Sequence, residues 1–322
     1  MKRILVTGAS GYIGGQTVLV LRDQGYEVIG LDQVTPSDTV ADACIKFIQN
    51  DFDQIPRLNL MRTYDIGTII HCAGTSLVGP SVANPQLYYD NNFVKTKQLL
   101  DYLIWTQMAS KVRVIFSSTA AVYGELTTLP ALETFATNPI SPYGESKLMI
   151  EMLMNSYSRA YGLDYIIFRY FNACGADPKV RHGQLPKATH IFARLLESIR
   201  DDKQFTLYGN TYPTPDGTCI RDYIHVDDIV QAHLLAINKN IPKGIYNLGL
   251  GRGASNAEVI AAAEKHTNKK ANIVIGEIRQ GDPAELTASA DKWKAVSNWN
   301  PKYNLADMVA HSWAWYTHQY IQ

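Results

Sequence analysis

The sequence predicts an α/β fold built around a parallel, doubly wound β-sheet, with a smaller α/β domain toward the C-terminus. Short β-branched runs alternate with longer helical patterns through the first half of the chain, as is typical of strands joined by helical crossovers. The chain has 322 residues, which is more than one hydrophobic core usually supports. A second, smaller domain is therefore expected beside the sheet.

The expected elements of the sheet follow in chain order. A helix is expected over about 11–24 and another from about Asn91. The expected strands are Ile4–Thr7, Glu27–Asp32, Thr68–Cys72, Val112–Ser118, Asp164–Arg169 and Gly244–Leu248. We assign residues 1–175 to the sheet domain, with about 222–250 returning to it, and residues 176–322 mainly to the second domain.

The second domain begins where the composition changes. Residues 175–223 are rich in Pro, Gly, Asp and Lys, and residues 208–217 have the pattern of a loop with two turns. Beyond about Gly251 we expect an alanine-rich helix and then an isolated strand at Ala271–Ile275. The chain ends in an aromatic segment, and we expect its Trp313, Trp315 and Tyr316 to be core residues.

Composition excludes several classes of function. Lysine and arginine total 30, as do aspartate and glutamate, so no basic field favours nucleic acid as a partner. The four cysteines are widely spaced and form no C-x-x-C pair, which predicts buried thiols in a reducing compartment and no metal site. No stretch has the apolar length of a signal peptide or a membrane span. We expect a cytoplasmic protein.

A glycine-rich turn predicts a dinucleotide site. Gly8, Gly11 and Gly14 directly follow the first strand and open the first helix, where a pyrophosphate can approach backbone N–H groups. A turn without any ligand is the alternative. Asp32, which ends the second strand 24 residues after Gly8, favours the ligand because a carboxylate there can bind the adenosine ribose. No arginine follows Asp32, so the Rossmann-type pattern favours NAD over NADP. Asp51 is expected to reach the adenine or, equally, to be a solvated loop acid.

A second motif predicts acid–base chemistry. Tyr143 and Lys147 are four residues apart and so share one face of the helix expected to run to Tyr161. A neighbouring ammonium can lower the pKa of a phenol from about 10, which would let Tyr143 exchange a proton with a sugar hydroxyl. A surface Tyr/Lys pair is the ordinary alternative. The strand ending at Ser117, Ser118 and Thr119 favours the catalytic interpretation, because ligands bind at the carboxyl edge of such sheets.

With these motifs together, the sequence resembles the extended short-chain dehydrogenases/reductases, and within them the UDP-glucose 4-epimerases. The matching segments run over nearly the whole chain and are strong only in combination. They are TGASGYIG at 7–14, YYDNN at 88–92, SSTAAVYG at 117–124, SPYG at 141–144, RYFN at 169–172, RDYIHV at 221–226 and YNLG at 246–249.

The resemblance implies NAD-dependent inversion of carbon 4 of a UDP-hexose. Tyr143 would take the proton of the 4-hydroxyl while hydride passes between carbon 4 and NAD, giving a transient 4-keto sugar. Thr119 would bind the reacting oxygen, and Lys147 would hold the nicotinamide ribose and acidify the tyrosine. The positions implied to contact the cofactor are Gly8, Gly11, Tyr12, Ile13, Gly14, Asp32, Asp51, Phe52, Ala73, Gly74, Asn92, Ser117, Tyr143, Lys147 and Tyr170.

The resemblance also implies the substrate site, with two departures from the family pattern. The implied substrate positions are Thr119, Asn172, His190, Arg221, Arg279, Asp282 and Leu286. Arginine suits a diphosphate because its planar guanidinium can bind two oxygens. His190 stands where the family often has asparagine, and Thr75-Ser76 where it has a cofactor-binding lysine. Leu286 is of intermediate size at a position that influences whether an N-acetyl group fits.

Three other functions compete with this interpretation. A UDP-N-acetylglucosamine or UDP-pentose 4-epimerase would share the same chemistry. A nucleotide-sugar dehydratase needs an Asp-Glu pair after the threonine, and this chain has Ala120 and Ala121. A non-catalytic NAD-binding protein of this fold would be expected to lose the Tyr/Lys pair.

The helix after Tyr143 also predicts a homodimer. Apolar residues nearly encircle it, and one face needs cover beyond the sheet. They are Leu148, Met149, Ile150, Met152, Leu153 and Met154. The resemblance implies that this helix pairs across a four-helix interface with the one at about Asn92–Tyr102.

Overall fold

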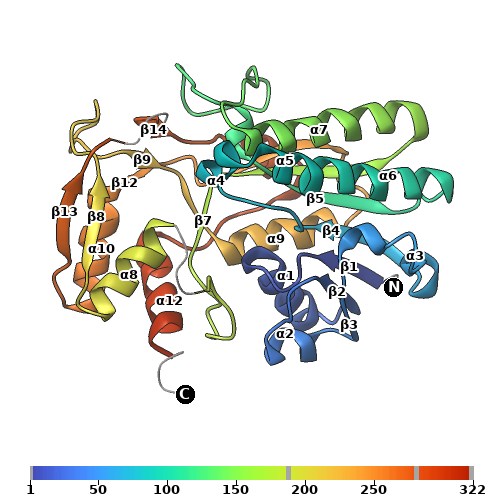
Figure 1. The fold of residues 1–322 in the computed structure, drawn as a ribbon, viewed down its shortest axis with the longest axis horizontal. Helices are drawn as coiled ribbons and strands as arrows, with labels where there is room; N and C mark the ends of the chain where they lie inside the picture. The colour runs from blue at the N-terminus through green and yellow to red at the C-terminus, as the bar shows by residue number, and fades with distance from the viewer. Residues whose placement is uncertain (1–2, 186–189, 279–282, 319–322) are drawn as a thin grey trace.

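A seven-stranded parallel sheet forms the centre of the molecule (Figure 1). This computed structural model describes residues 3–185, 190–278 and 283–318. The strand order is β11-β6-β5-β4-β1-β2-β3, so the winding direction changes between β1 and β4, where such sheets bind ligands. The strands are β1 (Arg3–Thr7), β2 (Val28–Asp32), β3 (Lys46–Gln49), β4 (Ile66–His71), β5 (Arg113–Thr119), β6 (Asp164–Tyr170) and β11 (Gly244–Leu248).

Helices cover both faces of this sheet, as Figure 1 shows with α6 and α7 above it and α1, α2 and α9 below it. One hydrophobic cluster packs the lower helices on the strands, and a second cluster packs the upper ones. The lower helices are α1 (Tyr12–Asp23), α2 (Asp38–Ala43), α9 (Val226–Ala236) and α11 (Asp291–Ser297), and the upper ones are α3 (Leu60–Thr63), α6 (Lys95–Trp105) and α7 (Pro142–Tyr161).

Cover on both faces explains why the strands are runs of apolar residues rather than alternating ones. Every residue of β4 is buried, and so are four of the five in β1. All six strands expected from the sequence lie in the sheet and are confirmed, as is its doubly wound parallel arrangement. β3 is the missed strand. It lies at the sheet edge, and its residues Lys46 and Gln49 are exposed, so its pattern is weak.

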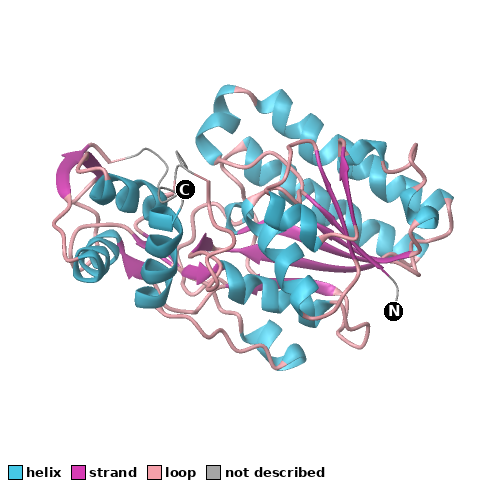
Figure 2. Ribbon diagram, turned by 90° about the horizontal axis from the view of Figure 1, so that it is seen from below, coloured by secondary structure: helices cyan, strands magenta, loops and turns pink. Residues whose placement is uncertain are grey.

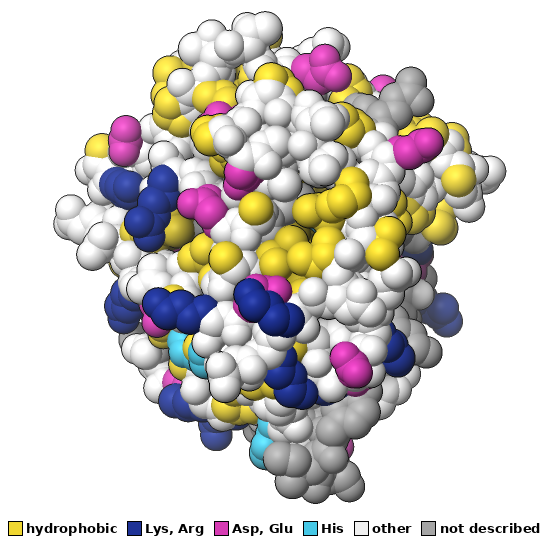
Figure 3. Space-filling view, turned by 90° about the vertical axis from the view of Figure 1, so that its left-hand side faces the viewer, with side chains coloured by type: hydrophobic (Ala, Val, Ile, Leu, Met, Phe, Trp, Pro, Cys, Tyr) yellow, Lys and Arg dark blue, Asp and Glu magenta, His cyan; other side chains and the backbone are white. Residues whose placement is uncertain are grey.

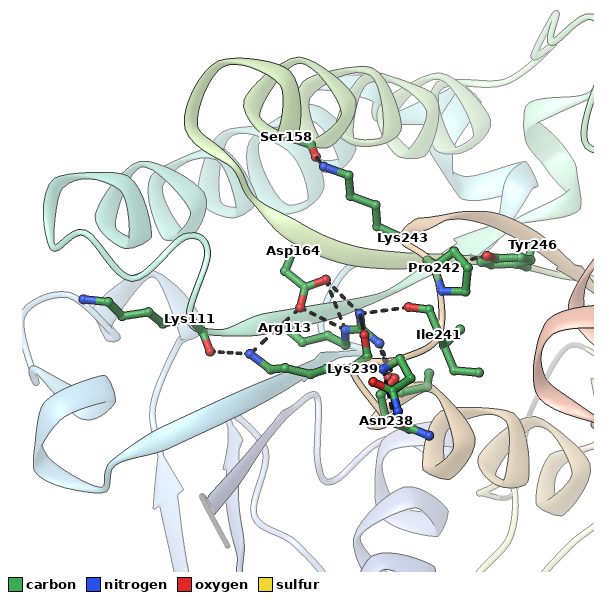
Figure 4. A network of polar contacts seen from close by, with 12 residues as sticks. Lys111, Arg113, Ser158, Asp164, Asn238, Lys239, Ile241, Pro242, Lys243 and Tyr246 are labelled. Carbon is green, nitrogen blue, oxygen red and sulfur yellow. Dashed lines mark hydrogen bonds and ion pairs between the residues drawn. The ribbon is translucent and has the colours of Figure 1, made fainter.

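A buried arginine lies at the edge of the sheet where the strands begin, opposite the carboxyl ends (Figure 4). Arg113 forms an ion pair with Asp164 at 2.9 Å, which joins the starts of β5 and β6. Its guanidinium also donates to the carbonyls of Ala236, Asn238, Lys239 and Ile241, at 2.6–3.3 Å. These bonds fix the turn from α9 to β11, which lets residues 244–248 join the sheet.

The smaller lobe stands at one end of the sheet (Figure 2). Its helices α8 (Ile191–Arg200), α10 (Asn256–Thr267) and α12 (Leu305–His318) share a third core cluster. Trp315 and Tyr316 are buried there and Trp313 is partly buried, as expected of core residues. The strand expected at Ala271–Ile275 is confirmed as β13 (Asn272–Gly276), but the expectation that it is isolated was wrong. β13 pairs in parallel with β8 (Gln204–Tyr208), a strand that the sequence analysis did not expect and that ends where the predicted loop at 208–217 begins.

Short strands connect the lobe to the sheet. β7 (Asn172–Cys174) pairs in parallel with β10 (Tyr223–His225). β9 (Ile220–Arg221) lies between β12 (Ala254–Ser255) and β14 (Glu285–Leu286). These strands bring segments far apart in sequence to the side of the molecule where the central strands end.

The outer face of the lobe mixes hydrophobic side chains with charges of both signs (Figure 3). Val274, Ile275 and Ile278 are each exposed by 41–48%. Within the described ranges, none of the helices combines the length and apolar character that crossing a membrane requires.

Candidate active site

The glycine-rich turn leads from β1 into α1. Gly8 has a φ of 71°, and a Cβ there would stand 2.7 Å from the backbone nitrogen of Ala73, so a larger residue would clash. A Cβ at Gly14 would stand 2.0 Å from the Gly8 carbonyl oxygen. Gly11 caps α1 without a side-chain bond, so the first turn of the helix presents backbone N–H groups. Ile13 packs against the core, and the Tyr12 hydroxyl donates to the Gly175 carbonyl at 2.7 Å.

A cavity of about 310 Å³ opens beside this turn. The Asp32 carboxylate stands at its wall and accepts the N–H groups of Ser10 and Val34, both at 3.0 Å. The lining residues are Gly8, Gly11, Leu31, Asp32, Gln33, Val34, Asn50, Phe52, Cys72, Ala73, Gly74, Thr75 and Asn91. The glycine cradle and the carboxylate at a strand end fit the pyrophosphate and ribose of NAD.

The cavity includes positions that sequence reasoning missed, and nine of the fifteen expected cofactor positions, Asp51 among them, are not part of its lining. Gln33, Val34, Asn50 and Thr75 follow strand ends, which was the available signal for them. Asp51 does not line the cavity. Its carboxylate pairs with Lys95 and accepts a bond from the Gln33 amide at 2.9 Å. Its expected contact with adenine thus remains a prediction.

The Tyr/Lys pair lies in the first turns of α7. Ser141 caps this helix by accepting the Gly144 N–H at 3.3 Å, and Pro142 follows as the first helical residue. Tyr143 is half-buried and hydrogen-bonded to Thr119 at the end of β5. The structure therefore brings together the phenol and the hydroxyl that the resemblance assigns to the reacting oxygen.

The electrostatics of the pair differ from the expectation. Burial raises the pKa of Tyr143 above 10, and the bond with Thr119 only partly opposes this. Burial also lowers the pKa of Lys147 to about 8. The Lys147 ammonium donates to the Ser117 carbonyl at 2.9 Å and lies 4.8 Å from the centre of the Phe116 ring. The expected lowering of the Tyr143 pKa is therefore not observed, because burial outweighs the bonds to the phenol.

Asn92 fixes the loop that follows β4. It lies in a π-helical turn, η2 (Tyr89–Val94), a distortion often found at functional sites. Its amide accepts the Thr75 N–H at 2.7 Å and donates at 3.0 Å to both the Thr75 carbonyl and the Ser146 hydroxyl. A Cβ at Gly74 would stand 2.8 Å from its oxygen. Asn92 thus holds Thr75 at the cavity rim. Thr75 is one of the two residues that stand where the family pattern has a cofactor-binding lysine.

A chain of hydroxyls continues behind the lysine. The Ser117 hydroxyl lies 3.0 Å from the Tyr170 hydroxyl, which lies 2.5 Å from His233 Nε2. His233 is buried, and burial lowers its pKa to about 3, so it is neutral. Sequence reasoning missed His233, because nothing in α9 distinguishes it from an ordinary core residue. This chain orients Tyr170 and Ser117, both expected near the cofactor.

The candidate substrate residues are only partly brought together. Asn172 begins β7. Arg221 is largely buried on β9 and pairs in register with Leu286 on β14. Leu286 packs against a small core cluster that contains Ala120 and Phe171. His190 is exposed just before α8, and Arg279 and Asp282 lie outside the described residues.

Comparisons with known proteins agree with this geometry. The family model described as the NAD dependent epimerase/dehydratase family matches residues 4–249. The UDP-glucose 4-epimerase of Halalkalibacterium halodurans is 42% identical over 320 residues, covering 97% of this chain and 95% of its own. A structure of UDP-glucose 4-epimerase from Bifidobacterium longum with NAD+ and UDP is 34% identical, with a TM-score of 0.89 over 98% of each chain. The epimerase of Stenotrophomonas maltophila, with bound NAD and formylated UDP-arabinopyranose, is 31% identical, with a TM-score of 0.93 over 100% of this chain and 99% of that one.

Proposed function

We propose that this chain interconverts UDP-glucose and UDP-galactose by inverting carbon 4 of the hexose. The chain belongs to the NAD-dependent epimerase/dehydratase family. The observation that carries the proposal is the hydrogen bond between Tyr143 and Thr119 at the end of β5. Lys147, four residues along α7, donates to the Ser117 carbonyl of the same strand and lies close to Gly74 in the cavity lining. The relatives named above are epimerases of this kind and cover nearly the whole chain.

Each of these residues takes a role in the proposed reaction. Tyr143 takes the proton of the 4-hydroxyl as the ketone forms, and returns it to the oxygen after the sugar has turned over. Thr119 donates a hydrogen bond to that oxygen and keeps it within reach of the phenol. NAD supplies reversible hydride acceptance at carbon 4, so no external oxidant is consumed. Lys147, Asp32 and the glycine cradle hold the cofactor.

The two parts of the chain divide the ligands between them. The sheet domain, residues 1–175 with about 222–250, binds the dinucleotide, and residues 176–322 mainly bind the UDP-sugar. Arg221 and Asn172 suit the diphosphate, and Leu286 forms part of the sugar pocket. Arg279, Asp282 and His190 remain candidates on the resemblance alone. A cytoplasmic location remains a prediction, with all four cysteines free.

Loss of water is the less favoured chemistry. A nucleotide-sugar dehydratase needs an acid and a base after the threonine, and Ala120 and Ala121 supply neither. The Ala120 side chain is buried in a core cluster. Acetylated UDP-hexoses and UDP-pentoses, in contrast, require the same chemistry as UDP-glucose and are the alternative substrates.

We propose a homodimer through the outer faces of α6 and α7. Trp105 at the end of α6 is 78% exposed and Met152 on α7 is 63% exposed, whereas Ile150 and Met154 face the core. A second copy of these helices would cover both exposed side chains.

Purified protein should be incubated separately with UDP-glucose, UDP-N-acetylglucosamine and UDP-xylose, and each mixture analysed for its 4-epimer. We expect UDP-galactose from UDP-glucose.

Tyr143→Phe should retain NAD yet turn over at least ~100-fold more slowly, the usual scale for a positioned acid/base group. Tyr157→Phe, which removes a hydroxyl bonded to Asp101 farther along α7, serves as the control. Equal rates in the two variants would refute the assigned base.

A further inference from the structure

Asp222 joins three segments that carry candidate substrate residues. It follows Arg221 directly and is completely buried. Its backbone N–H donates to the Leu286 carbonyl at 3.1 Å, and its backbone carbonyl accepts the Asn172 N–H at 2.9 Å. The main chain of one residue therefore connects the segments of Arg221, Leu286 and Asn172.

The side chain of Asp222 adds three more bonds. Its carboxylate accepts the backbone N–H groups of Leu250 at 2.7 Å, Gly251 at 3.0 Å and Ala288 at 3.1 Å. Leu250 and Gly251 follow β11, the strand at the edge of the central sheet, whereas Ala288 follows β14 of the lobe. The carboxylate thus bonds the central sheet to the wall that carries Leu286.

Strand geometry places this carboxylate behind the proposed pocket. Arg221 and Leu286 are partners in register on parallel strands, so their side chains point to the same face. Successive residues of an extended chain point to opposite faces, so the Asp222 side chain points away from that face. Asp222 therefore acts on the pocket through the backbone it holds and not by touching a ligand.

The carboxylate fits a role in which its charge matters. Burial raises the pKa of this carboxyl group, and the N–H groups of Leu250, Ala288 and Gly251 partly oppose the rise, so that the pKa is about 6. The group is thus ionised at neutral pH, and bonds from N–H groups to a carboxylate are stronger than bonds between neutral partners. A Cβ at Gly249 would stand 2.6 Å from one carboxylate oxygen, so a larger residue at position 249 would clash with the carboxylate.

We propose that Asp222 is a positioning residue for the UDP-sugar, whose carboxylate fixes the wall formed by Arg221 and Leu286 against the end of β11. The inference rests on the proposed function, because it takes these two residues as substrate contacts. None of the bonds of Asp222 named above reaches Tyr143, Lys147 or the glycine-rich turn. It should therefore govern substrate affinity and leave the chemical step and the cofactor largely unchanged.

The test is Asp222→Asn in the NAD-loaded enzyme. The amide keeps the size of the side chain but presents N–H groups where the carboxylate accepts them, so some of the three bonds are lost. We expect the Kd for UDP, measured by calorimetry, and the KM for UDP-galactose both to rise about 10-fold, with kcat and bound NAD within about 3-fold of wild type.

Asp228→Asn is the matched control. Asp228 is also completely buried, accepts the backbone N–H groups of Lys302 and Tyr303, and has a pKa raised by burial to about 6. It holds no candidate substrate segment, so UDP affinity should stay near wild type even if stability falls. Equal effects of the two variants on UDP affinity, or wild-type affinity in Asp222→Asn, would overturn the inference. Failure of the wild-type protein to bind UDP would instead refute the proposed function.

Gly249→Ala provides a second variant if Asp222→Asn does not fold. The added methyl group would press on the carboxylate of Asp222 and on the Cβ of Ala288 at 2.9 Å, with no change of charge. We expect weaker UDP binding with bound NAD retained. Unchanged UDP affinity in Gly249→Ala would equally overturn the positioning role.

Discussion

Replacing Lys147 by methionine should stabilise the NAD-free protein while removing its activity. The Lys147 side chain is 5% exposed, and burial lowers its pKa from 10.5 to about 8. Because the folded protein binds this proton less tightly than the unfolded chain, the ionised lysine opposes folding at pH 7. The difference between the two pKa values corresponds to about 3 kcal/mol.

Methionine has similar length and no charge, so it removes this penalty without leaving a large cavity. It also loses the bond to the Ser117 carbonyl, which costs about 1–2 kcal/mol. The net gain of about 1–2 kcal/mol should raise the Tm by roughly 2 °C, given an unfolding entropy of ~2.1 cal/mol/K per residue.

The pH dependence gives a sharper check by scanning calorimetry of NAD-stripped protein. Between pH 8 and 10.5 the folded wild type has lost the proton while the unfolded chain still holds it, so the penalty on the wild type fades as the pH rises. The Tm advantage of Lys147→Met should therefore be largest at pH 7 and shrink toward pH 10. Lys265→Met, at an exposed site on α10, is the control and should show no such trend. A lower Tm for Lys147→Met at pH 7, or an advantage independent of pH, would refute the reasoning.

Three further predictions concern the cofactor, the sugar and the assembly. NAD should remain bound through purification because the proposed cycle regenerates it, and chromatography of acid-denatured protein should detect it; its absence would count against a closed redox cycle. Leu286→Tyr should reduce any activity on N-acetylated UDP-sugars before that on plain hexoses, because the larger ring narrows the proposed pocket, and equal losses on both would place Leu286 elsewhere. Trp105→Glu should shift the mass measured by light scattering from dimer to monomer, because a charge would replace an apolar side chain that is 78% exposed on α6; a wild-type protein that is already monomeric would refute the interface.

The parts of the fold predictable from sequence are those set by local pattern. The central strands are apolar runs because both faces of the sheet are covered, and the glycine turn follows β1 directly. Asp32 and Thr119 each end a strand of one parallel sheet, and parallel strands all end at the same edge. Their placement at the carboxyl edge of the sheet can therefore be predicted from sequence. The same rule misses β3 and β8, since each is short and has exposed positions that dilute the pattern.

The sequence predicts which side chains share a face of α7 but not the direction of their pKa shifts. A spacing of four residues places Tyr143 and Lys147 on one helix face whatever surrounds them. Burial is set by segments far along the chain, such as the one around Tyr88, whose ring centroid lies 6.3 Å from that of Tyr143. Because burial disfavours both ionised forms, it raises one pKa and lowers the other, the opposite of what adjacency alone suggests.

The lobe shows where pattern reasoning reaches its limit. Asp222 bonds to backbone groups of five residues that are distant in sequence. Asn172 lies 50 residues before it, and Leu250, Gly251, Leu286 and Ala288 lie 28–66 residues after it. No helical or strand period connects such positions, and a buried aspartate after an arginine looks like any loop acid in the sequence. A cofactor cradle can be found from a single strand–turn–helix unit, because one local turn builds most of it. A wall assembled from four separate segments becomes visible only when the fold shows that one carboxylate holds them together.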